Sequence, residues 1–221
     1  MSMHVTVAAF DVDNTLTVRD CVVPFMRSAA GTARLVKVIL SKAGETFKSV
    51  RRRDRDALKA KFVAGIFAGK DAREVESLGI QFASKVADKW LRSDVATRLR
   101  WHQEQGHVVI LVSASLGAYL HPLGDLLEVD AVLCTELEEK DGLLTGNLVG
   151  QNCRGKEKAS RVQKWCQDSG RATEDLVYAY GDSSGDTELL ELFSEPTWVN
   201  DIDLVVLVQR PGSSGDRATP S

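Results

Sequence analysis

The sequence lacks a CxxC pair and any run of about 20 apolar residues, and each absence excludes a class of protein. The cysteines are scattered along the chain, at Cys21, Cys134, Cys153 and Cys166. Their spacing indicates reduced thiols, mostly in a core, and offers no metal-ligand pattern. Without a long apolar run there is no candidate membrane span, so we expect no stable membrane association.

Charge of either sign is not in excess. The 28 Lys and Arg residues against 31 Asp and Glu residues give a net charge of -3, which indicates neither a nucleic-acid nor an anionic-membrane partner. The N-terminus has no basic segment, and its apolar run is too short for a signal peptide and ends in an acid. We therefore expect a cytoplasmic protein. Its 221 residues, 43% of them hydrophobic, suffice for one domain with an insertion or for two small domains.

The stretch AAFDVDNTLT, residues 8–17, is the most informative part of the chain. The β-branched and aromatic residues before Asp11 predict a short buried strand. Asp11 and Asp13 should point to the same side at the end of this strand, where their charges repel. A divalent cation or a shared proton would relieve that repulsion. The alternative is an Asp/Asn turn that only caps a helix.

Residues 20–105 have a different, helical pattern. Apolar residues recur at helical spacing at Leu58, Phe62 and Ile66, and again at Val75, Leu78, Phe82, Val86 and Trp90. Gly44, Gly69 with Lys70, and Ser93 mark breaks between helices. The basic run at residues 48–56 is either a solvated helix end or an edge facing an anion. Residues 33–40, ARLVKVIL, indicate a packed helix, with a membrane-surface helix as the alternative.

From residue 107 strands and helices alternate. Apolar runs predict strands at 107–113, 130–134, 176–182 and 196–200, and helical spacing predicts helices around Tyr119 and Leu123, at 155–169 and at 185–193. Asp141-Gly142 between two short runs predicts a β-hairpin. This order implies parallel pairing, and we predict an α/β fold with a doubly wound parallel sheet. The composition of residues 211–221 predicts a disordered tail.

The carboxyl ends of parallel strands meet at one edge of a sheet, which is where ligands bind. This rule gathers polar residues that are far apart in the sequence, namely Asp11, Asp13, Ser113, Asp182, Asp186 and either Lys156 or Lys158. Singly, a serine at a strand end can be a cap and an acid can favour a helix N-terminus. Together they fit phosphoryl transfer. Mg²⁺ takes oxygen ligands, a carboxylate can attack phosphorus, and a hydroxyl and an ammonium group can hold the phosphoryl oxygens.

These residues match the motifs of a known family. DVDNT, the strand ending at Ser113, the Gly-x-x-Lys helix start at residues 155–158 and GDSSGD resemble the four motifs of the haloacid dehalogenase (HAD) superfamily. Within it, the chain from residue 5 to about 205 resembles subfamily IB, which includes phosphoserine phosphatase. The resemblance implies an HAD-like Rossmannoid core at residues 1–18 and 94–210, with an all-helical cap inserted at residues 19–93.

The resemblance also implies a role for each motif residue. Asp11 would be the nucleophile and a Mg²⁺ ligand, and Asp13 the general acid and base, with its carbonyl group also on the metal. Lys158, favoured over Lys156 by the Gly-x-x-Lys spacing, would neutralise Asp11 and the phosphoryl group. The remaining assignments are Thr15 to loop shape, Ser113 and Ala114 to substrate binding, Asp182 to the metal and Asp186 to orienting the groups around it.

The substrate is the least defined part of this reading. Phosphoserine phosphatases have Glu where this chain has Asp20, Gly-Gly after the serine that matches Ser113, and Asn in place of Gly185. We expect a phosphomonoesterase of a small phosphorylated metabolite, phosphoserine being one candidate. Asp20 would bind that substrate, and one arginine of residues 51–55 could bind a carboxylate.

Two other functions remain open. One is a phosphatase of a lipid head group, which depends on the apolar residues 33–40. The other is a receiver module phosphorylated on aspartate, which the helical insert and the end of the 130–134 strand at Cys134 disfavour. A homodimer also remains open. The histidines at positions 4, 102, 107 and 121 show no pairing in the sequence.

Overall fold

The computed structural model describes residues 5–41 and 55–200, with side chains described except at 32–41 and 55–58. Gly44, Arg51 to Arg53 and the tail at 211–221 lie outside the described residues. A five-stranded parallel sheet has the order β3-β2-β1-β6-β7. The strands are β1 (Val7–Phe10), β2 (Val108–Leu116), β3 (Ala131–Thr135), β6 (Leu176–Gly181) and β7 (Glu195–Trp198). The predicted α/β fold with a parallel sheet is confirmed.

The central strand β1 is buried on both sides. Val7 and Ala9 belong to one hydrophobic cluster, whereas Ala8 and Phe10 belong to the other, as the alternation of side chains along a strand requires. Phe10 is aligned with Leu111 of β2 and with Tyr180 of β6. This register brings the carboxyl ends of three strands to the same edge of the sheet.

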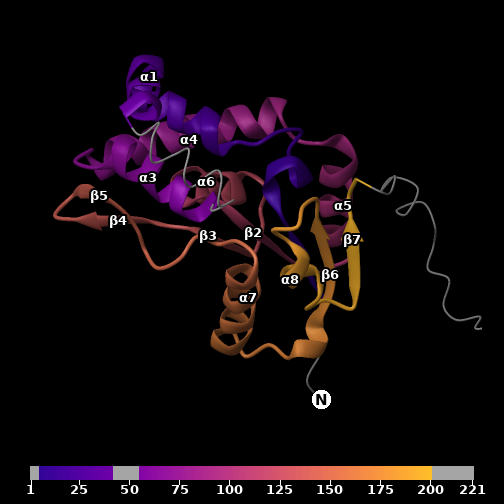
Figure 1. Ribbon diagram of the computed structural model, residues 1–221. Helices are drawn as coiled ribbons and strands as arrows, with labels where there is room; N and C mark the ends of the chain where they lie inside the picture. The colour runs from indigo at the N-terminus through magenta and orange to yellow at the C-terminus, as the bar shows by residue number, and fades with distance from the viewer. Residues whose placement is uncertain (1–4, 42–54, 201–221) are drawn as a thin grey trace, which may run out of the picture.

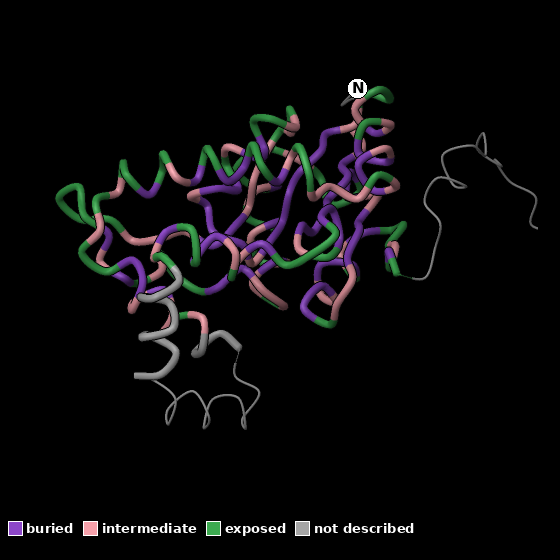
Figure 2. Tube along the Cα trace, turned by 90° about the horizontal axis from the view of Figure 1, so that it is seen from above, coloured by how far each residue is buried: buried purple, intermediate pink, exposed green. Residues whose placement is uncertain are grey.

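Helices cover both faces of the sheet, and the buried trace runs between them (Figure 2). The core helices are α5 (Ser93–Glu104), α6 (Gly117–Leu126), α7 (Lys156–Asp168) and α8 (Thr187–Leu190), with a 3-10 turn η2 (Thr173–Asp175) before β6. The prediction of a helix at 185–193 was too long. After α8 the amides of Leu192 and Phe193 bond three residues back, which tightens the chain into a turn before β7.

The insert between β1 and β2 is helical, as predicted. It contains α1 (Val22–Ser41), α3 (Arg55–Phe67) and α4 (Ala72–Lys89), which gather at one end of the molecule (Figure 1). Gly31 interrupts α1 with a φ of 72°, a conformation that favours glycine. The breaks predicted at Gly69 with Lys70 and at Ser93 are confirmed.

The two segments that join this insert to the core lie side by side. Thr17 and Leu91 form an antiparallel bridge. The Val18 amide donates to the Trp90 carbonyl at 2.8 Å, and the Arg92 amide donates to the Leu16 carbonyl at 2.9 Å. The chain therefore leaves the core and returns to it through a short hydrogen-bonded ribbon, which we call the linker ribbon.

The predicted hairpin forms and packs against the insert. It consists of β4 (Leu137–Lys140) and β5 (Leu143–Leu148), with positive φ at Asp141 and Gly142. The Gly69 amide donates to the Leu144 carbonyl and the Leu144 amide to the Lys70 carbonyl, each at 2.8 Å. Figure 1 shows the hairpin beside α3. The hairpin comes many residues after the insert in the sequence, yet in the structure it packs beside the helices of the insert.

A close helix–helix contact also joins the insert to the core. A Cβ atom at Gly79 of α4 would lie 1.8 Å from the Ala118 carbonyl oxygen of α6. No side chain fits in that space, so glycine allows the two helix backbones to touch. The insert is therefore packed on the core as well as connected to it.

The described histidines have partners that the sequence did not reveal, although their interpretation as structural or surface residues is compatible with a buried His102 and an exposed His121. His102 Nδ1 and His107 Nδ1 lie 2.8 Å apart, and His102 Nε2 lies 2.9 Å from the Tyr180 hydroxyl. His121 Nε2 lies 2.7 Å from a Glu136 carboxylate oxygen. Histidines separated by a helix end or a strand meet through tertiary packing, which the spacing in the sequence does not reveal.

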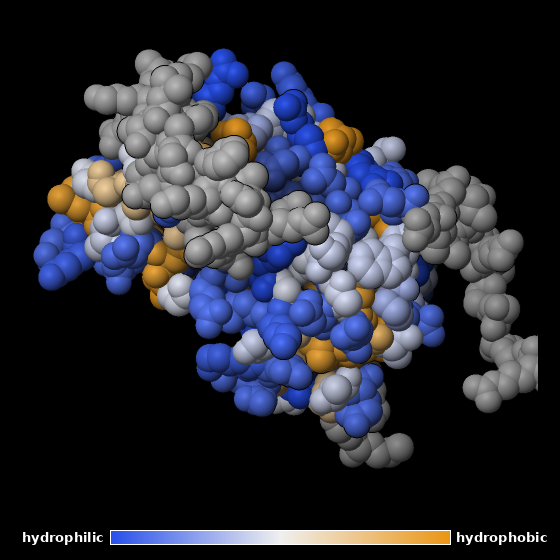
Figure 3. Space-filling view, in the orientation of Figure 1, coloured by the Kyte–Doolittle hydropathy of each residue, from blue (hydrophilic) through white to orange (hydrophobic). Residues whose placement is uncertain are grey.

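The four cysteines are free thiols and all are buried, as predicted. Among the described residues no helix is long and apolar enough to cross a membrane. On the face shown in Figure 3, apolar side chains outside the grey atoms occur in small groups separated by polar ones.

Candidate active site

The sheet edge where β1, β2 and β6 end carries a cleft of about 460 Å³. The sequence-predicted site residues that line it are Asp11, Asp13, Asp20, Ser113, Ala114, Lys158, Asp182 and Asp186. They come from four separate segments of the chain. The structure therefore brings together the residues that the strand-end rule gathers.

A buried lysine lies between two buried carboxylates. Lys158 Nζ donates to Asp11 Oδ1 at 2.6 Å and to Asp186 Oδ1 at 2.5 Å. The side chains of Lys158 and Asp186 are each 2% exposed and that of Asp11 is 7% exposed. Lys156, the rival for this position, is exposed at the start of α7. Of the two lysines, only Lys158 contacts the acidic residues.

The charges of this group shift each other's protonation. Burial alone would lower the pKa of Lys158, but Asp11 and Asp186 raise it above its usual value, so the ammonium group is retained. Burial raises the pKa of Asp11 to about 7, helped by Asp186 and Asp13 and opposed by Lys158. Asp11 therefore keeps a full negative charge at neutral pH only when further positive charge is close by.

The loop after β1 holds Asp13 in a fixed orientation. This loop, η1 (Val12–Leu16), is one tight turn in which Asn14 has a φ of 60°. Asp13 Oδ1 accepts from the Cys21 amide at 2.8 Å, and Oδ2 accepts from the Ser115 hydroxyl at 2.5 Å. Burial and the nearby Asp20 raise the pKa of Asp13 to about 6, while the hydrogen bonds from Ser115 and Cys21 act in the opposite direction.

The contact of Ser115 with Asp13 is part of a longer arrangement that the sequence did not reveal. The Tyr119 hydroxyl donates to Ser115 Oγ at 2.6 Å, and both side chains are fully buried. Ser115 and Tyr119 are four residues apart, at the junction of β2 and α6. The available signal was a serine in place of the second glycine that phosphoserine phosphatases have there.

Ser113 and Ala114 lie within β2 and line the cleft. The prediction that this strand ends at Ser113 was wrong, because β2 continues to Leu116 after an irregular stretch in its pairing with β3. Ser113 Oγ accepts from the Ser115 amide at 3.1 Å, and a hydroxyl that accepts in this way can still donate its own proton. The Ala114 carbonyl accepts from the Thr135 hydroxyl at 3.0 Å and from Lys59 Nζ. Lys59 belongs to α3, so the insert supplies a cation to this cleft, and sequence reasoning missed it.

The two acids after β6 have different surroundings. Asp182 is half-buried and accepts from Thr15 Oγ1 at 3.3 Å, and burial and Asp186 raise its pKa. Both oxygens of Asp186 are engaged, one by Lys158 and the other by the amide and hydroxyl of Ser183 at 3.1 Å and 3.0 Å. Asp182 therefore has more freedom to contact a ligand than Asp186.

The acidic groups have the geometry of a cation site. One carboxylate oxygen from each of Asp11, Asp182 and Asp186 lies within 4.8 Å of the others. Among the described residues, Lys158 is the cation that forms ion pairs with Asp11 and Asp186. Burial is the main cause that raises the pKa values of Asp11 and Asp182, and neighbouring acids add to it. A hard divalent cation prefers such oxygen ligands, so this donor set fits one.

Asp20 lies at the outer margin of the cleft. It is exposed, and its Oδ1 accepts from the Val23 amide at 3.2 Å near the start of α1. Of the arginines at 51–55 that were candidates for substrate binding, Arg51 to Arg53 lie outside the described residues and the side chain of Arg55 is not described.

A model of the haloacid dehalogenase-like hydrolase family matches residues 8–191 of the chain. The chain is 34% identical to the protein CicA of Caulobacter vibrioides over 188 residues, which are 85% of this chain and 82% of CicA. It is 26% identical to a histidinol-phosphatase of Neisseria meningitidis over 204 residues, 87% of this chain and 89% of that protein. The fold resembles a solved phospho-aspartyl intermediate analogue of phosphoserine phosphatase, with a TM-score of 0.59, 20% identity, and coverage of 86% of this chain and 84% of that one.

Proposed function

The chain belongs to the haloacid dehalogenase-like hydrolases, and on this premise we propose that it is a Mg²⁺-dependent phosphomonoesterase that works through an aspartyl-phosphate. The observation that carries this proposal is the buried contact of Asp11 with Lys158, beside Asp182 and Asp186. The receiver alternative loses its basis, because the family match extends over both the helical insert and the core.

Asp11 is the proposed nucleophile. Lys158 bonds Asp11 Oδ1, so we assign the attack on phosphorus to Oδ2. The new bond joins this oxygen to phosphorus, and the bond from phosphorus to the ester oxygen breaks. Lys158, with the Ser113 hydroxyl, would balance the charge of the transferred phosphoryl group.

Asp13 is the proposed general acid and base. Its proton would pass to the leaving ester oxygen in the first step. The ionised carboxylate would then take a proton from the water that attacks the aspartyl-phosphate, which releases inorganic phosphate and restores Asp11. A pKa of about 6 suits both duties near neutral pH.

The acidic cluster supports the proposal of Mg²⁺. Asp11, Asp182 and the Asp13 backbone carbonyl would hold the ion, and Asp186 would fix Lys158 and the Ser183 loop around them. When bound, Mg²⁺ supplies positive charge to the phosphoryl oxygens and keeps the Asp11 carboxylate ionised.

The substrate we propose is a small phosphorylated metabolite with an ammonium group near its phosphate. A histidinol-phosphatase is among the relatives, and the motifs resemble those of phosphoserine phosphatases. Histidinol phosphate and phosphoserine share a primary phosphate and an ammonium group on the next carbon. The exposed Asp20 carboxylate at the cleft margin would attract that group. We propose a cytoplasmic location, which the four free thiols support.

Release of inorganic phosphate from phenyl phosphate with and without Mg²⁺ tests the proposal. We expect turnover that needs the metal, and we expect Asp11→Asn to reduce it at least about 10³-fold. The exposed Asp88→Asn on α4 is the matched control and should leave the rate unchanged. Full activity of Asp11→Asn would contradict the assignment of Asp11 as the nucleophile. Absence of turnover with every phosphomonoester tested would contradict the proposed function.

A further inference from the structure

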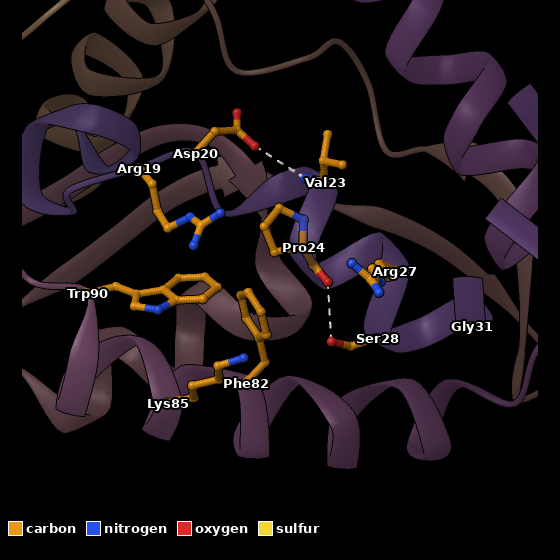
Figure 4. A pocket seen from close by; sticks show the side chains of 10 residues that line it. All are labelled: Arg19, Asp20, Val23, Pro24, Arg27, Ser28, Gly31, Phe82, Lys85 and Trp90. Carbon is orange, nitrogen blue, oxygen red and sulfur yellow. Dashed lines mark hydrogen bonds between the residues drawn. The ribbon is translucent and has the colours of Figure 1, made fainter. Parts of the chain in front are cut away.

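A second cleft, of about 780 Å³, lies between α1 and α4 of the insert (Figure 4). Three cationic side chains line it, Arg19, Arg27 and Lys85, together with the aromatic rings of Phe82 and Trp90. Among the described residues of its lining, Asp20 supplies the only carboxylate. We call this space the cationic cleft.

Two of these cations are held by an aromatic ring and not by acids. The Arg19 guanidinium carbon lies 4.8 Å from the centre of the Trp90 ring, and Lys85 Nζ lies 5.0 Å from it. In Figure 4 Arg19 is above the ring and Lys85 below it. Within the described part of the chain, no carboxylate forms an ion pair with either. The positive charges of Arg19 and Lys85 are therefore available to an anion.

The cationic cleft adjoins the active site. Asp20 and Val23 line both spaces, so they form a shared wall. The Asp20 carboxylate accepts a hydrogen bond from the Val23 amide, so these two residues are also joined to each other. A molecule whose phosphate lies against Asp11 can extend past Asp20 into the cleft.

We propose that the cationic cleft binds a second anionic group, carried by the leaving group of the substrate. The substrate class is then a phosphomonoester whose alcohol part ends in a carboxylate or a further phosphate, with apolar atoms between the two charged ends. Phe82 and Trp90 would contact the apolar part, and Arg27 and Lys85 the distal anion. This inference rests on the proposed phosphatase function and specifies its substrate.

A series of substrates with increasing reach tests this. Alkyl phosphates and the matching ω-carboxyalkyl phosphates, with two to eight methylene groups, differ only in the distal charge. We expect kcat/KM to favour the carboxylated member at some chain lengths and not at others, because the anion must reach the cleft. A preference equal at all lengths would indicate long-range attraction and would contradict a defined subsite.

A double variant, Arg27→Gln with Lys85→Gln, tests the cleft residues directly. Both side chains are exposed on helices, so the substitutions are compatible with the fold. We expect KM for the preferred carboxylated substrate to rise about fivefold to thirtyfold, with kcat and the kinetics of the alkyl phosphates that lack a distal charge unchanged. Lys89→Gln removes one positive charge four residues after Lys85 on α4, outside the cleft, and should change neither the KM of the carboxylated substrate nor the kinetics of the alkyl phosphates.

The outcomes separate this inference from the proposed function. If no member of either series is hydrolysed, the phosphatase proposal fails. If both series are hydrolysed equally well, or if the double variant keeps the preference, only the subsite fails. A third outcome is that neither substrate series is preferred, but inorganic sulfate changes the rate of phenyl phosphate hydrolysis in the wild type and not in the double variant. This result would show that the cleft binds a free anion and would overturn the proposed subsite.

Discussion

The carboxylate of Asp13 is held at both oxygens by groups from different parts of the chain. The Cys21 amide fixes one oxygen and the Ser115 hydroxyl the other, and Tyr119 fixes Ser115 in turn. An acid that must meet both a leaving group and a water benefits from a single orientation. Ser115 is therefore a positioning residue for the proposed acid and base.

Ser115→Ala should lower kcat about tenfold or more, because it removes a hydrogen bond to a charged group. KM should change little, since Lys158 and Ser113, the proposed phosphate contacts, remain. Ser115→Thr keeps the hydroxyl and should restore most of the rate. Steady-state kinetics on phenyl phosphate measures both constants, and a rise in KM at unchanged kcat would contradict this role.

His102 gives a testable dependence of stability on pH. Burial, with Arg98 and His107 nearby, lowers its pKa to about 2 in the folded state, whereas the unfolded value is near 6.5. Below pH 6.5 the unfolded chain binds a proton that the folded one does not, so the contribution of His102 to stability is lost as pH falls. The raised pKa values of Asp11 and Asp13 act in the opposite direction.

Comparison with His102→Gln isolates the histidine. The wild type should be the more stable at pH 7.5, and its advantage should shrink by about 2 kcal/mol at pH 5, as one proton over 1.5 pH units implies. Urea unfolding at both pH values, with Mg²⁺ present, measures this difference. An advantage that stays constant would show that His102 takes up its proton equally in both states.

For single residues, the sequence predicted the site residues that follow an apolar strand and missed those that come together only through packing. Asp11 and Asp182 directly follow β1 and β6, and Ser113 follows the apolar run of β2, although that strand continues to Leu116. Apolar runs of this kind are local and can be read from the sequence. Lys59 and the Ser115–Tyr119 pair could not be identified, because their partners lie on other elements and depend on how the helices pack.

Among the elements, α4 and α6 form the contact that seats the insert on the core. Gly79 lies against the Ala118 carbonyl, in a space that no side chain fits. Helix propensity alone would favour alanine at this position by about 1 kcal/mol. Packing opposes that preference, since an added Cβ must push the two helices apart.

Gly79→Ala should therefore destabilise the protein by about 1–3 kcal/mol, the cost of overpacking. Thermal unfolding should show a midpoint lower by several degrees, at about 2–4 °C per kcal/mol for a chain of this size. Gln81→Ala, exposed on the same helix, should not lower the midpoint. A midpoint raised by Gly79→Ala would mean that propensity outweighs the contact.

The elements themselves were mostly readable from periodicity and turn residues. The Asp141-Gly142 signal predicted the hairpin, and Gly69 with Lys70 predicted the end of α3. The length of α8 was not readable, because its apolar residues continue into a turn. That the hairpin packs on α3 follows from tertiary contacts to Gly69 and Lys70, which no local pattern contains.

For the whole molecule, we expect the acidic cluster at the sheet edge to couple folding to cation binding. Lys158 is the one cation in contact with Asp11 and Asp186 among the described residues, and Asp182 lies within the same cluster. A divalent cation that binds only the folded state stabilises it, by about 2.7 kcal/mol at 100 times its dissociation constant.

Mg²⁺ should therefore raise the thermal midpoint at pH 8 by about 5–10 °C when it is near saturation. The shift should be smaller at pH 5.5, because the pKa of Asp11 is about 7 and its protonated form is a poor ligand. Asp182→Asn should reduce the shift at pH 8. Equal shifts in that variant and the wild type would place the bound ion elsewhere.

The linker ribbon has a consequence for the history of this architecture. Because Thr17 and Leu91 are paired, the insert begins and ends at neighbouring points of the core. A domain with adjacent ends can be lost, gained or exchanged without stretching the chain that receives it. Different inserts between these two residues could then change which substrates reach the active site, while the core keeps the same reaction.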